Sequence, residues 1–520
     1  MELLKKNIHM MREKGRSVNR VTLEEDSNVP DQQPDVERII QNKAVVHTDD
    51  IQVEPDTVII SGSLQICVLY VSDTPEHQIH RLDAKIPFRE RQNLQGVVPG
   101  ETVHLKWEVE DISVSPINSR KLSMKALLAF TASVEEVYDA QAAVELHGVP
   151  EASTLAKDLE LLQLAVQKKD ILRIKDEVAV SSNKPNIANV LWESIQLRGT
   201  DYRVLDGQID IKGELFVFVL YEGDDENRTR QWLETALPFQ GVIECKECSS
   251  DMVSQIDIVL SQSSLEVLED YDGERRLLAL EALLDLDIKL YTEEKVRVLE
   301  DIYSPVKNLV PVTEQQVYES LLVKNFSKVR SGERIRLEAN QPRMLQTCSS
   351  RGEVRIDSMA QTEKGIEVEG AVFITVLYVS SDDKTPYAVL EGAVPFQQTI
   401  EVNGITKDCR FTMQTDLEQL STTMIDSEEI EAKVCVNLNV FVIQVHREQC
   451  IVDIEEKEMD MKKLQELPGI VGYIVQPGDT LWEISKHYCT TPERICALNQ
   501  IEEGNVKSGM RLMIIKTVSS

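Results

Sequence analysis

One pattern occurs three times along the chain with the same internal spacing. A proline is followed 28 residues later by a glycine, and the tripeptide Val-Leu-Tyr ends eight residues after that glycine. A Pro-Phe pair then begins 17 residues beyond the tyrosine. The copies start at Pro34, Pro185 and Pro342, so they are offset by 151 and 157 residues. Because solenoid units repeat every 20–45 residues or so, offsets of this size predict three tandem domains.

The segment from glycine to tyrosine is typical of a β-strand. It is "GSLQICVLY" in the first copy, "GELFVFVLY" in the second and "GAVFITVLY" in the third. Apolar residues alternate on one face, and Phe216, Phe218 and Phe373 add apolar groups to the other, so we expect strands buried on both sides. The glycine predicts a bulge or a close backbone approach, and the Pro-Phe pair fits the start of a later strand.

The C-terminal end differs from the repeats in charge and in pattern. Residues 470–520 contain five acidic and five basic residues, whereas the whole chain has a formal net charge of −32. Thr480 followed by Glu483 has the spacing of a capping box, and Pro492 is tolerated at the first position of a second helix. We therefore predict strand, helix, helix and strand, near residues 473–475, 481–488, 491–499 and 511–515.

Two resemblances follow from these patterns. The three co-registered copies resemble the SPOCS domain of spore-coat and spore-envelope proteins in endospore-forming Firmicutes, from about residue 18 to about residue 450. The stretch from "YIVQPGDTLWEISKHY" to "SGMRLMI" is similar to a LysM domain. The predicted fold class is therefore mainly β and multidomain, with three tandem β-rich, sandwich-like repeats and a small C-terminal βααβ LysM domain.

The LysM resemblance implies a shallow groove for glycans that contain N-acetylglucosamine. The loop after the first strand and the loop after the second helix would form it. Transferred to this sequence, the groove residues are Gly478, Asp479, Thr480, Leu481, Asn499, Gln500 and Ile501. Asp479 and Thr480 also suit the capping of a helix, and Asn499 can end one, so both interpretations stay open.

Departures from the LysM pattern favour a protein as the ligand. Cys489 stands where a glycine usually follows the tyrosine, and "SGM" replaces Pro-Gly-Gln before the last strand. The candidate contacts for such a partner are Ile474, Trp482 and Arg494, because an aromatic residue and an arginine are typical interface hot spots.

SPOCS-like repeats followed by one LysM-like domain resemble the SipL-like family of clostridial spore-coat morphogenetic proteins. The resemblance implies a non-enzymatic adaptor in the mother-cell cytoplasm, at the forespore surface. It would bind the coat basement ATPase, the stage IV A sporulation protein, largely through the LysM domain, and would localise coat around the forespore. Other coat proteins are further candidate partners. The alternative is a binder of peptidoglycan or cortex glycan, in which the β-repeats are spacers.

Charge and composition restrict the classes of partner that the chain can bind. The chain has 56 basic and 88 acidic residues, so a phosphate backbone would be repelled and we expect no nucleic-acid partner. No run of about 18 apolar residues occurs, which predicts no membrane insertion and no export. The nine scattered cysteines favour reduced core thiols in an intracellular protein.

Neither catalysis nor a cofactor is predicted. Cys245 and Cys248 form a lone C-x2-C pair without the second pair that a structural zinc site needs, so we expect free thiols in a turn. Nucleotide-binding, metalloprotease and serine-hydrolase motifs do not occur. We therefore predict no catalytic, cofactor-binding or metal-ligating residues.

The predicted layout has eight parts. They are an N-terminal segment (1–17), repeat 1 (18–140), a helical connector (141–165), repeat 2 (166–300), a second helical connector (301–329), repeat 3 (330–452), a charged linker (453–470) and the LysM domain (471–517). The helical prediction for the connectors rests on residues 152–170 and 314–329, and the N-terminal stretch is a further helix candidate.

Overall fold

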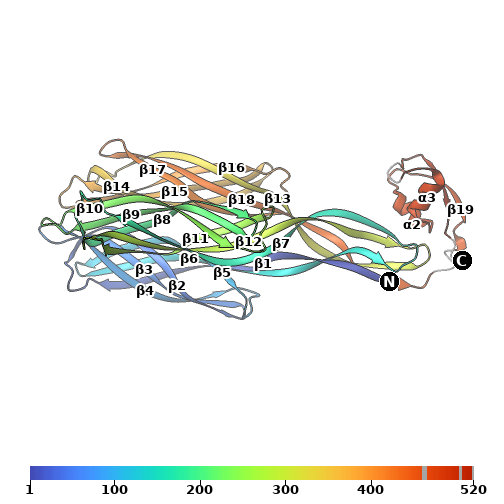
Figure 1. The fold of residues 1–520 in the computed structure, drawn as a ribbon, viewed down its shortest axis with the longest axis horizontal. Coiled ribbons are helices and arrows are strands. Elements are labelled where there is room, and N and C mark those ends of the chain that lie inside the picture. The colour runs from blue at the N-terminus through green and yellow to red at the C-terminus, as the bar shows by residue number, and fades with distance from the viewer. Residues whose placement is uncertain (460–464, 503–505, 518–520) are drawn as a thin grey trace.

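The computed structural model describes residues 1–459, 465–502 and 506–517. Strands account for 74% of it and helices for 3%, which confirms the mainly β prediction. Three repeats lie side by side in a head, and long strands extend from the head as a stalk that leads to a small C-terminal domain (Figure 1). The predicted charged linker, 453–470, begins inside the last long strand, and its residues 460–464 lie outside the described part of the chain.

Each repeat contributes six strands. Repeat 1 contains β1 (Glu2–Asn28), β2 (Val36–Glu54), β3 (Thr57–Ser72), β4 (Ile79–Asn93), β5 (Val103–Asn118) and β6 (Lys121–His147). Repeat 2 contains β7 (Ser153–Ala179), β8 (Ile187–Leu205), β9 (Gln208–Gly223), β10 (Arg230–Glu244), β11 (Val253–Glu269) and β12 (Arg275–Tyr303). Repeat 3 contains β13 (Asn308–Arg336), β14 (Met344–Thr362), β15 (Gly365–Ser380), β16 (Tyr387–Glu401), β17 (Cys409–Met424) and β18 (Glu429–Lys457).

Two antiparallel sheets form each repeat. In repeat 1 the sheet β2-β3-β4 packs against the sheet β1-β6-β5, and repeats 2 and 3 have the same arrangement. The alternating side chains of the middle strand, from Leu64 to Tyr70, are buried between the two sheets, as their period of two predicts. The repeats are therefore β-sandwiches that share one topology.

The first and last elements of the repeated pattern are joined by a hydrogen bond. The Tyr70 hydroxyl donates to the carbonyl oxygen of Pro34 at 3.1 Å. The corresponding bonds are 3.3 Å from Tyr221 to Pro185 and 2.9 Å from Tyr378 to Pro342. Each tyrosine ring is fully buried, so the hydroxyl needs a partner, and the constant spacing between tyrosine and proline provides it.

Removing one of these hydroxyls should destabilise its repeat. We expect Tyr378→Phe to lower the free energy of unfolding by about 1 kcal/mol, because the Pro342 carbonyl loses its donor inside the protein. Urea denaturation followed by circular dichroism measures this. Tyr271→Phe is the matched control, since Tyr271 is fully exposed in the turn before β12. Equal stability of the two variants would contradict a role for the bond.

The glycine and the Pro-Phe pair of the pattern lie opposite each other on neighbouring strands. Gly62 pairs with Phe88, Gly213 with Phe239, and Gly370 with Phe396. A Cβ atom on Gly62 would lie 2.2 Å from the His47 carbonyl oxygen and 2.8 Å from the Phe88 ring. A bulge in β2 faces this position, between Thr48 and Asp50. The predicted close backbone approach is therefore confirmed.

The position predicted for the Pro-Phe pair was wrong. Pro87 lies in the middle of β4 rather than at the start of a strand, and Pro238 and Pro395 lie likewise in β10 and β16. These three strands are sheet edges that pair with one neighbour only. A proline is tolerated inside an edge strand because its missing N–H belongs to the unpaired side.

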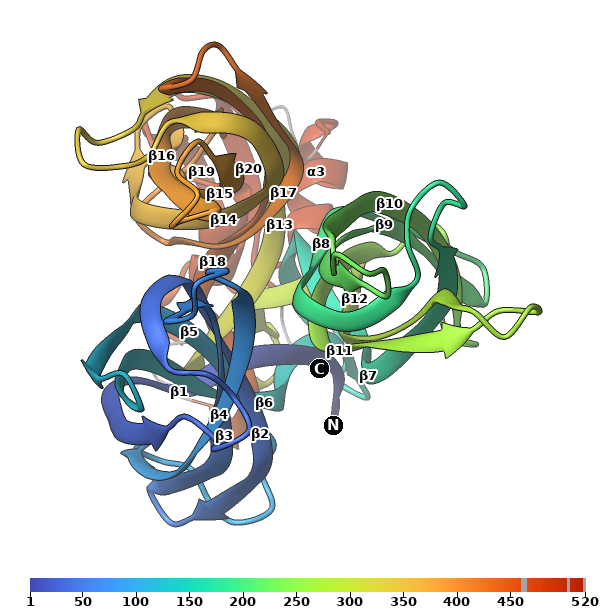
Figure 2. The ribbon, with the colours of Figure 1, turned by 90° about the vertical axis from the view of Figure 1, so that its left-hand side faces the viewer.

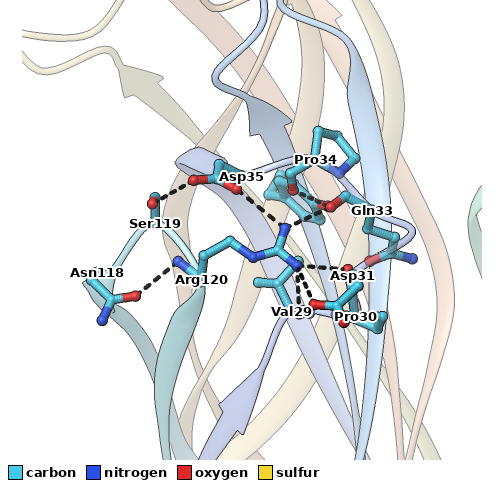
Figure 3. A network of polar contacts seen from close by, with 10 residues as sticks. Val29, Pro30, Asp31, Gln33, Pro34, Asp35, Asn118, Ser119 and Arg120 are labelled. Atoms are coloured by element: carbon cyan, nitrogen blue, oxygen red, sulfur yellow. Dashed lines mark hydrogen bonds and ion pairs between the residues drawn. The ribbon is translucent and has the colours of Figure 1, made fainter.

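An arginine holds the proline-containing loop of repeat 1 at the outer end of the head (Figure 3). The Arg120 guanidinium donates to the carbonyl oxygens of Val29, Pro30 and Gln33 at 2.6–3.0 Å. It also pairs with Asp35 at 3.2 Å, and the Ser119 hydroxyl, together with this arginine, lowers the pKa of the Asp35 carboxyl. Charge-assisted bonds to several carbonyls fix a loop better than neutral ones.

Repeats 2 and 3 hold the corresponding loop with other residues. In repeat 2, Arg276 donates to the Lys184 carbonyl oxygen. Repeat 3 reverses the charges, because Glu428 stands at the turn and pairs with Arg343 at 3.0 Å. The loops are thus held by different residues in the three repeats, which explains why the repeated pattern does not include an arginine.

The three repeats surround a common axis (Figure 2). Leu69, Leu220 and Leu377 occupy the same position in β3, β9 and β15, and they belong to one apolar cluster that draws on all three repeats. All three side chains are buried. Burial on both faces of the middle strands, as predicted, holds here and for Phe218, whereas Phe373 is exposed.

The stalk consists of three long two-stranded ribbons, β1–β6, β7–β12 and β13–β18 (Figure 1). A strand of 27 residues spans roughly 90 Å at about 3.3 Å per residue, which is longer than a sandwich requires. The parts of all six strands that extend beyond the sandwiches pack around a shared apolar cluster, which includes the fully buried ring of Tyr318. The chain therefore passes from one repeat to the next at the far tip of the stalk.

The predicted helical connectors were wrong. Residues 152–170 lie almost wholly in β7, residues 314–329 lie in β13, and the N-terminal stretch forms β1. Their Ala, Leu, Lys, Glu and Gln favour helix by only a few tenths of a kcal/mol per residue. Pairing with the apolar strands β12 and β18 along their whole length outweighs that preference. In the described part of the chain, no helix has the length and hydropathy needed to cross a membrane.

The prediction of free thiols at Cys245 and Cys248 was also wrong, because a disulfide joins them. A turn between β10 and β11, in which the Cys248 N–H donates to the Cys245 carbonyl, brings their Cα atoms within 5.4 Å. This distance lies in the range that a disulfide requires. The prediction of buried free thiols holds for a set of five residues: Cys67, Cys348, Cys409, Cys435 and Cys450.

Candidate functional site: the C-terminal domain on the stalk tip

The C-terminal domain has the predicted order of strand, helix, helix and strand. Its elements are β19 (Ile470–Ile474), α2 (Leu481–His487), α3 (Pro492–Asn499) and β20 (Arg511–Ile515). The two strands pair antiparallel, and both helices pack on one apolar cluster with them. Leu481, predicted as a groove residue, is part of that cluster, and Ile501 packs against it.

The loop before α2 is held by local hydrogen bonds. Thr480 caps the helix, its side chain accepts from the Glu483 N–H, and Glu483 reaches back to complete the predicted capping box. The Asp479 carboxylate accepts from the Tyr473 hydroxyl at 2.6 Å and from the Gln476 N–H at 2.8 Å. The hydrogen bond to Tyr473 lowers the pKa of Asp479 and raises the pKa of Tyr473 to about 12. Asp479 and Thr480 therefore brace the loop, and Gly478 lies exposed beside them.

The hydrogen bonds that the Asp479 carboxylate accepts, which brace the loop, should be lost in acid. A carboxyl whose folded pKa lies below its usual value of about 3.9 stabilises the fold above that value and loses its contribution as the pH falls through the folded pKa. We expect the Gln476 amide NMR signal to shift with a midpoint below pH 3.9 or so. Asp479→Asn should abolish this transition, and Tyr473→Phe should move it upward. A midpoint at or above the usual value would contradict the brace.

The loop after α3 is bound to the last strand. The Asn499 side chain donates to the Met513 carbonyl at 2.7 Å and accepts from the Met513 N–H at 2.7 Å. Gln500 has a left-handed backbone that ends the helix, and its side chain is exposed. Asn499 thus connects α3 to β20, while Gln500 remains accessible. The ligand-binding role predicted for these residues stays a prediction.

Trp482 contacts the stalk instead of facing outward. Its indole N–H donates to the Asp301 carboxylate at 2.8 Å, and its ring packs edge-on against Tyr303, with 4.8 Å between ring centroids. The Tyr303 hydroxyl lies 2.8 Å from the Ser485 hydroxyl and donates to the Thr490 carbonyl at 2.9 Å. Burial raises the pKa of Tyr303. An aromatic pair and buried hydroxyls therefore form the centre of the contact.

Ion pairs flank this centre. Lys486 binds the two oxygens of Asp301 at 2.8 and 2.6 Å. Arg494 pairs with Glu151 at 2.8 Å and also donates to the Thr517 hydroxyl. The four charged side chains remain 25–49% exposed, so each pair contributes roughly 0–1 kcal/mol. Basic groups of the C-terminal domain thus meet acidic groups of the stalk tip.

Ile474 lies on a different surface. It is 52% exposed on the outer face of the β19–β20 ribbon, where Met513 is 53% exposed. The predicted partner contacts are therefore divided: Trp482 and Arg494 lie on the side that faces the stalk, and Ile474 lies on a face without a stalk contact among the hydrogen bonds and ion pairs of the described residues.

Asp301, Tyr303 and Glu151 were not identified from the sequence. Tyr303 ends β12, Asp301 precedes it by two residues, and Glu151 lies in the connection before β7. Trp482 and Asp301 are 181 residues apart, so no local pattern joins them. The one available signal was charge, because the neutral module carries its basic residues beside a strongly acidic body.

Comparison with known protein families identifies the parts of the chain. Residues 35–117, 186–268 and 343–425 each match the SipL SPOCS domain, and residues 473–514 match the LysM domain. Together these segments cover just over half of the chain. The chain has the SipL-like architecture of three SPOCS domains followed by one LysM domain. Searches of curated proteins and of solved structures returned no match.

Each SPOCS match covers four of the six strands of its repeat. The match in repeat 1 runs from β2 to β5 and leaves out β1 and β6, which build the stalk, and repeats 2 and 3 agree. SPOCS and LysM are families of non-catalytic domains. The domain content supports a protein of sporulation and the spore coat that carries a module of a glycan-binding type.

Proposed function

We propose that the chain is a non-enzymatic adaptor of spore-coat assembly. Its LysM domain binds the coat basement ATPase, the stage IV A sporulation protein, and the chain localises coat around the forespore from the mother-cell cytoplasm. The observation that carries the proposal is the two-ended shape, with three SPOCS domains gathered in the head and one LysM domain at the far tip of the stalk (Figure 1).

The shape suits an adaptor because the two ends act on different neighbours. The head offers three related domains to other coat proteins, so weak contacts can combine through effective concentration. The stalk separates the LysM domain from that surface, and the apolar outer face of β19–β20 is exposed. Ile474 on this face is a candidate partner contact that a docked LysM domain leaves accessible.

One observation favours the second candidate function, a peptidoglycan or cortex glycan binder with the repeats as spacers. Gly478 and Gln500, on the two loops that form the glycan groove in LysM domains, are both exposed. The remaining groove residues serve the fold: Leu481 is in the core, Thr480 caps α2, and Asn499 binds β20. The groove is thus accessible, but most of its lining residues make contacts that stabilise the LysM fold.

One experiment compares the two functions on the full-length chain. The purified chain is mixed separately with the purified coat basement ATPase and with purified peptidoglycan, and bound protein is measured by pull-down and by sedimentation. We expect retention by the ATPase, loss of retention with Ile474→Asp, and no displacement by an N-acetylglucosamine oligomer. Sedimentation with peptidoglycan without ATPase binding would overturn the adaptor proposal.

A further inference from the structure

The side of the LysM domain that faces the stalk has a defined chemical preference. The indole N–H of Trp482 and the ammonium of Lys486 converge on one carboxylate, Asp301. The Tyr303 ring makes a T-shaped contact with the Trp482 ring, and Arg494 pairs with a second carboxylate, that of Glu151. Two carboxylates next to a phenol are therefore the groups that this side recognises.

The contact between the LysM domain and the stalk tip can open. The apolar cluster of the LysM domain consists of its own residues alone, among those that the structure describes, so the domain does not share a core with the stalk. The ion pairs are partly exposed and individually weak. Contacts between domains that lack a large apolar area allow relative motion of the domains.

Two of the residues predicted for partner binding, Trp482 and Arg494, are occupied by this contact. An external protein that uses them must first displace Asp301 and Glu151. When a binding-competent state is only partly populated, the apparent affinity falls by that fraction. The stalk tip would thus lower the affinity of the LysM domain for any partner on this side.

We propose that the side of the LysM domain formed by Trp482, Lys486 and Arg494 is an interaction surface for an acidic, aromatic segment of a partner protein, and that the stalk tip competes with that partner for it. The inference rests on the proposed function in taking the coat basement ATPase as the partner. It adds the chemistry of the recognised segment and an intramolecular competitor. The docked chain is the low-affinity form, and the undocked chain is the high-affinity form.

The test removes the competitor and leaves the LysM domain unchanged. The variant is the full-length chain with Glu151→Ala and Asp301→Ala together, and its matched control is Glu160→Ala with Glu293→Ala, two exposed acids farther along the same ribbon. The chain has four tryptophans. After labelling with 5-fluorotryptophan, Trp482→Phe identifies the Trp482 signal in the 19F NMR spectrum.

We expect the stalk variant to move the Trp482 signal and to bind the ATPase about tenfold more tightly, and the control to match the wild type. Asp301→Asn should fall between them. A synthetic peptide of residues 298–305, "VLEDIYSP", should return the Trp482 signal of the stalk variant toward its docked position. The same peptide with alanine at the aspartate and tyrosine positions should not.

The outcomes separate the two proposals. Unchanged ATPase affinity in a variant whose Trp482 signal has moved overturns the competition and leaves the adaptor function standing. A signal that does not move shows that the stalk tip does not occupy this surface, which overturns the inference. Recovery of the signal by the peptide, with no ATPase binding in any variant, supports the acidic-aromatic surface and rejects the ATPase as its partner.

Discussion

Replacing Leu220 by alanine should lower the free energy of unfolding by about 3 kcal/mol, with the loss concentrated in the association of the three SPOCS repeats. Leu220 is fully buried in the apolar cluster on the axis of the head, opposite Leu69 and Leu377. Truncation removes three carbon atoms, Cγ and its two methyl groups, from a site bounded by sheets of all three repeats, so little of the resulting cavity can collapse. Urea denaturation measures the loss, and small-angle scattering measures any opening of the head.

The control is Val242→Ala, because Val242 lies in β10 of the same repeat but is 51% exposed. It should change stability by less than about 0.5 kcal/mol. Because the axis is shared, Leu69→Ala and Leu377→Ala should resemble Leu220→Ala. A large effect at one position with no effect at the other two would contradict a common three-repeat core.

Alanine at Gly62 should be similarly damaging, with a loss of about 3 kcal/mol. A Cβ atom there would lie 2.2 Å from the carbonyl oxygen of His47, and backbone cannot move aside as the end of a flexible side chain can. Gly370 is comparable, with 2.4 Å to the Arg355 carbonyl oxygen. Thermal denaturation of purified variants measures the effect.

The same position in repeat 2 supplies the comparison. At Gly213 the nearest atom belongs to the Phe239 ring, at 2.9 Å, and the nearest carbonyl oxygen lies 3.4 Å away. Gly213→Ala should therefore cost about 1 kcal/mol. The expected order of damage is Gly62 and Gly370 first, then Gly213, and an equal loss at all three would show that the close backbone approach is not the cause.

The repeated pattern predicts part of the fold because each of its residues is in direct contact with another residue of the pattern. Gly62 lies against Phe88, and Tyr70 bonds to Pro34, so fixed spacing reflects direct contact within one sheet and its adjoining loop. The capping box of Thr480 and Glu483 was predictable for the same reason, since its partners are three residues apart. Short-range chemistry leaves a visible pattern in the sequence.

The stalk could not be predicted in this way. The segment that forms β7 has a composition that favours helix, and its strand conformation depends on β12, more than a hundred residues later. The contact of Trp482 with Asp301 and Tyr303 likewise joins residues far apart in the chain. The partner-binding role predicted for Trp482 stays a prediction, and its contact with the stalk tip lies outside the reach of local patterns.

The direction of the stalk strands has a mechanical consequence. A pull between a partner on the LysM domain and partners on the head would act along β18, parallel to the strand and perpendicular to its hydrogen bonds with β13. In that shear geometry many bonds carry the load together, whereas a peeling force would break them one at a time. The ribbons would therefore transmit tension between the two ends of the molecule without separating strand by strand.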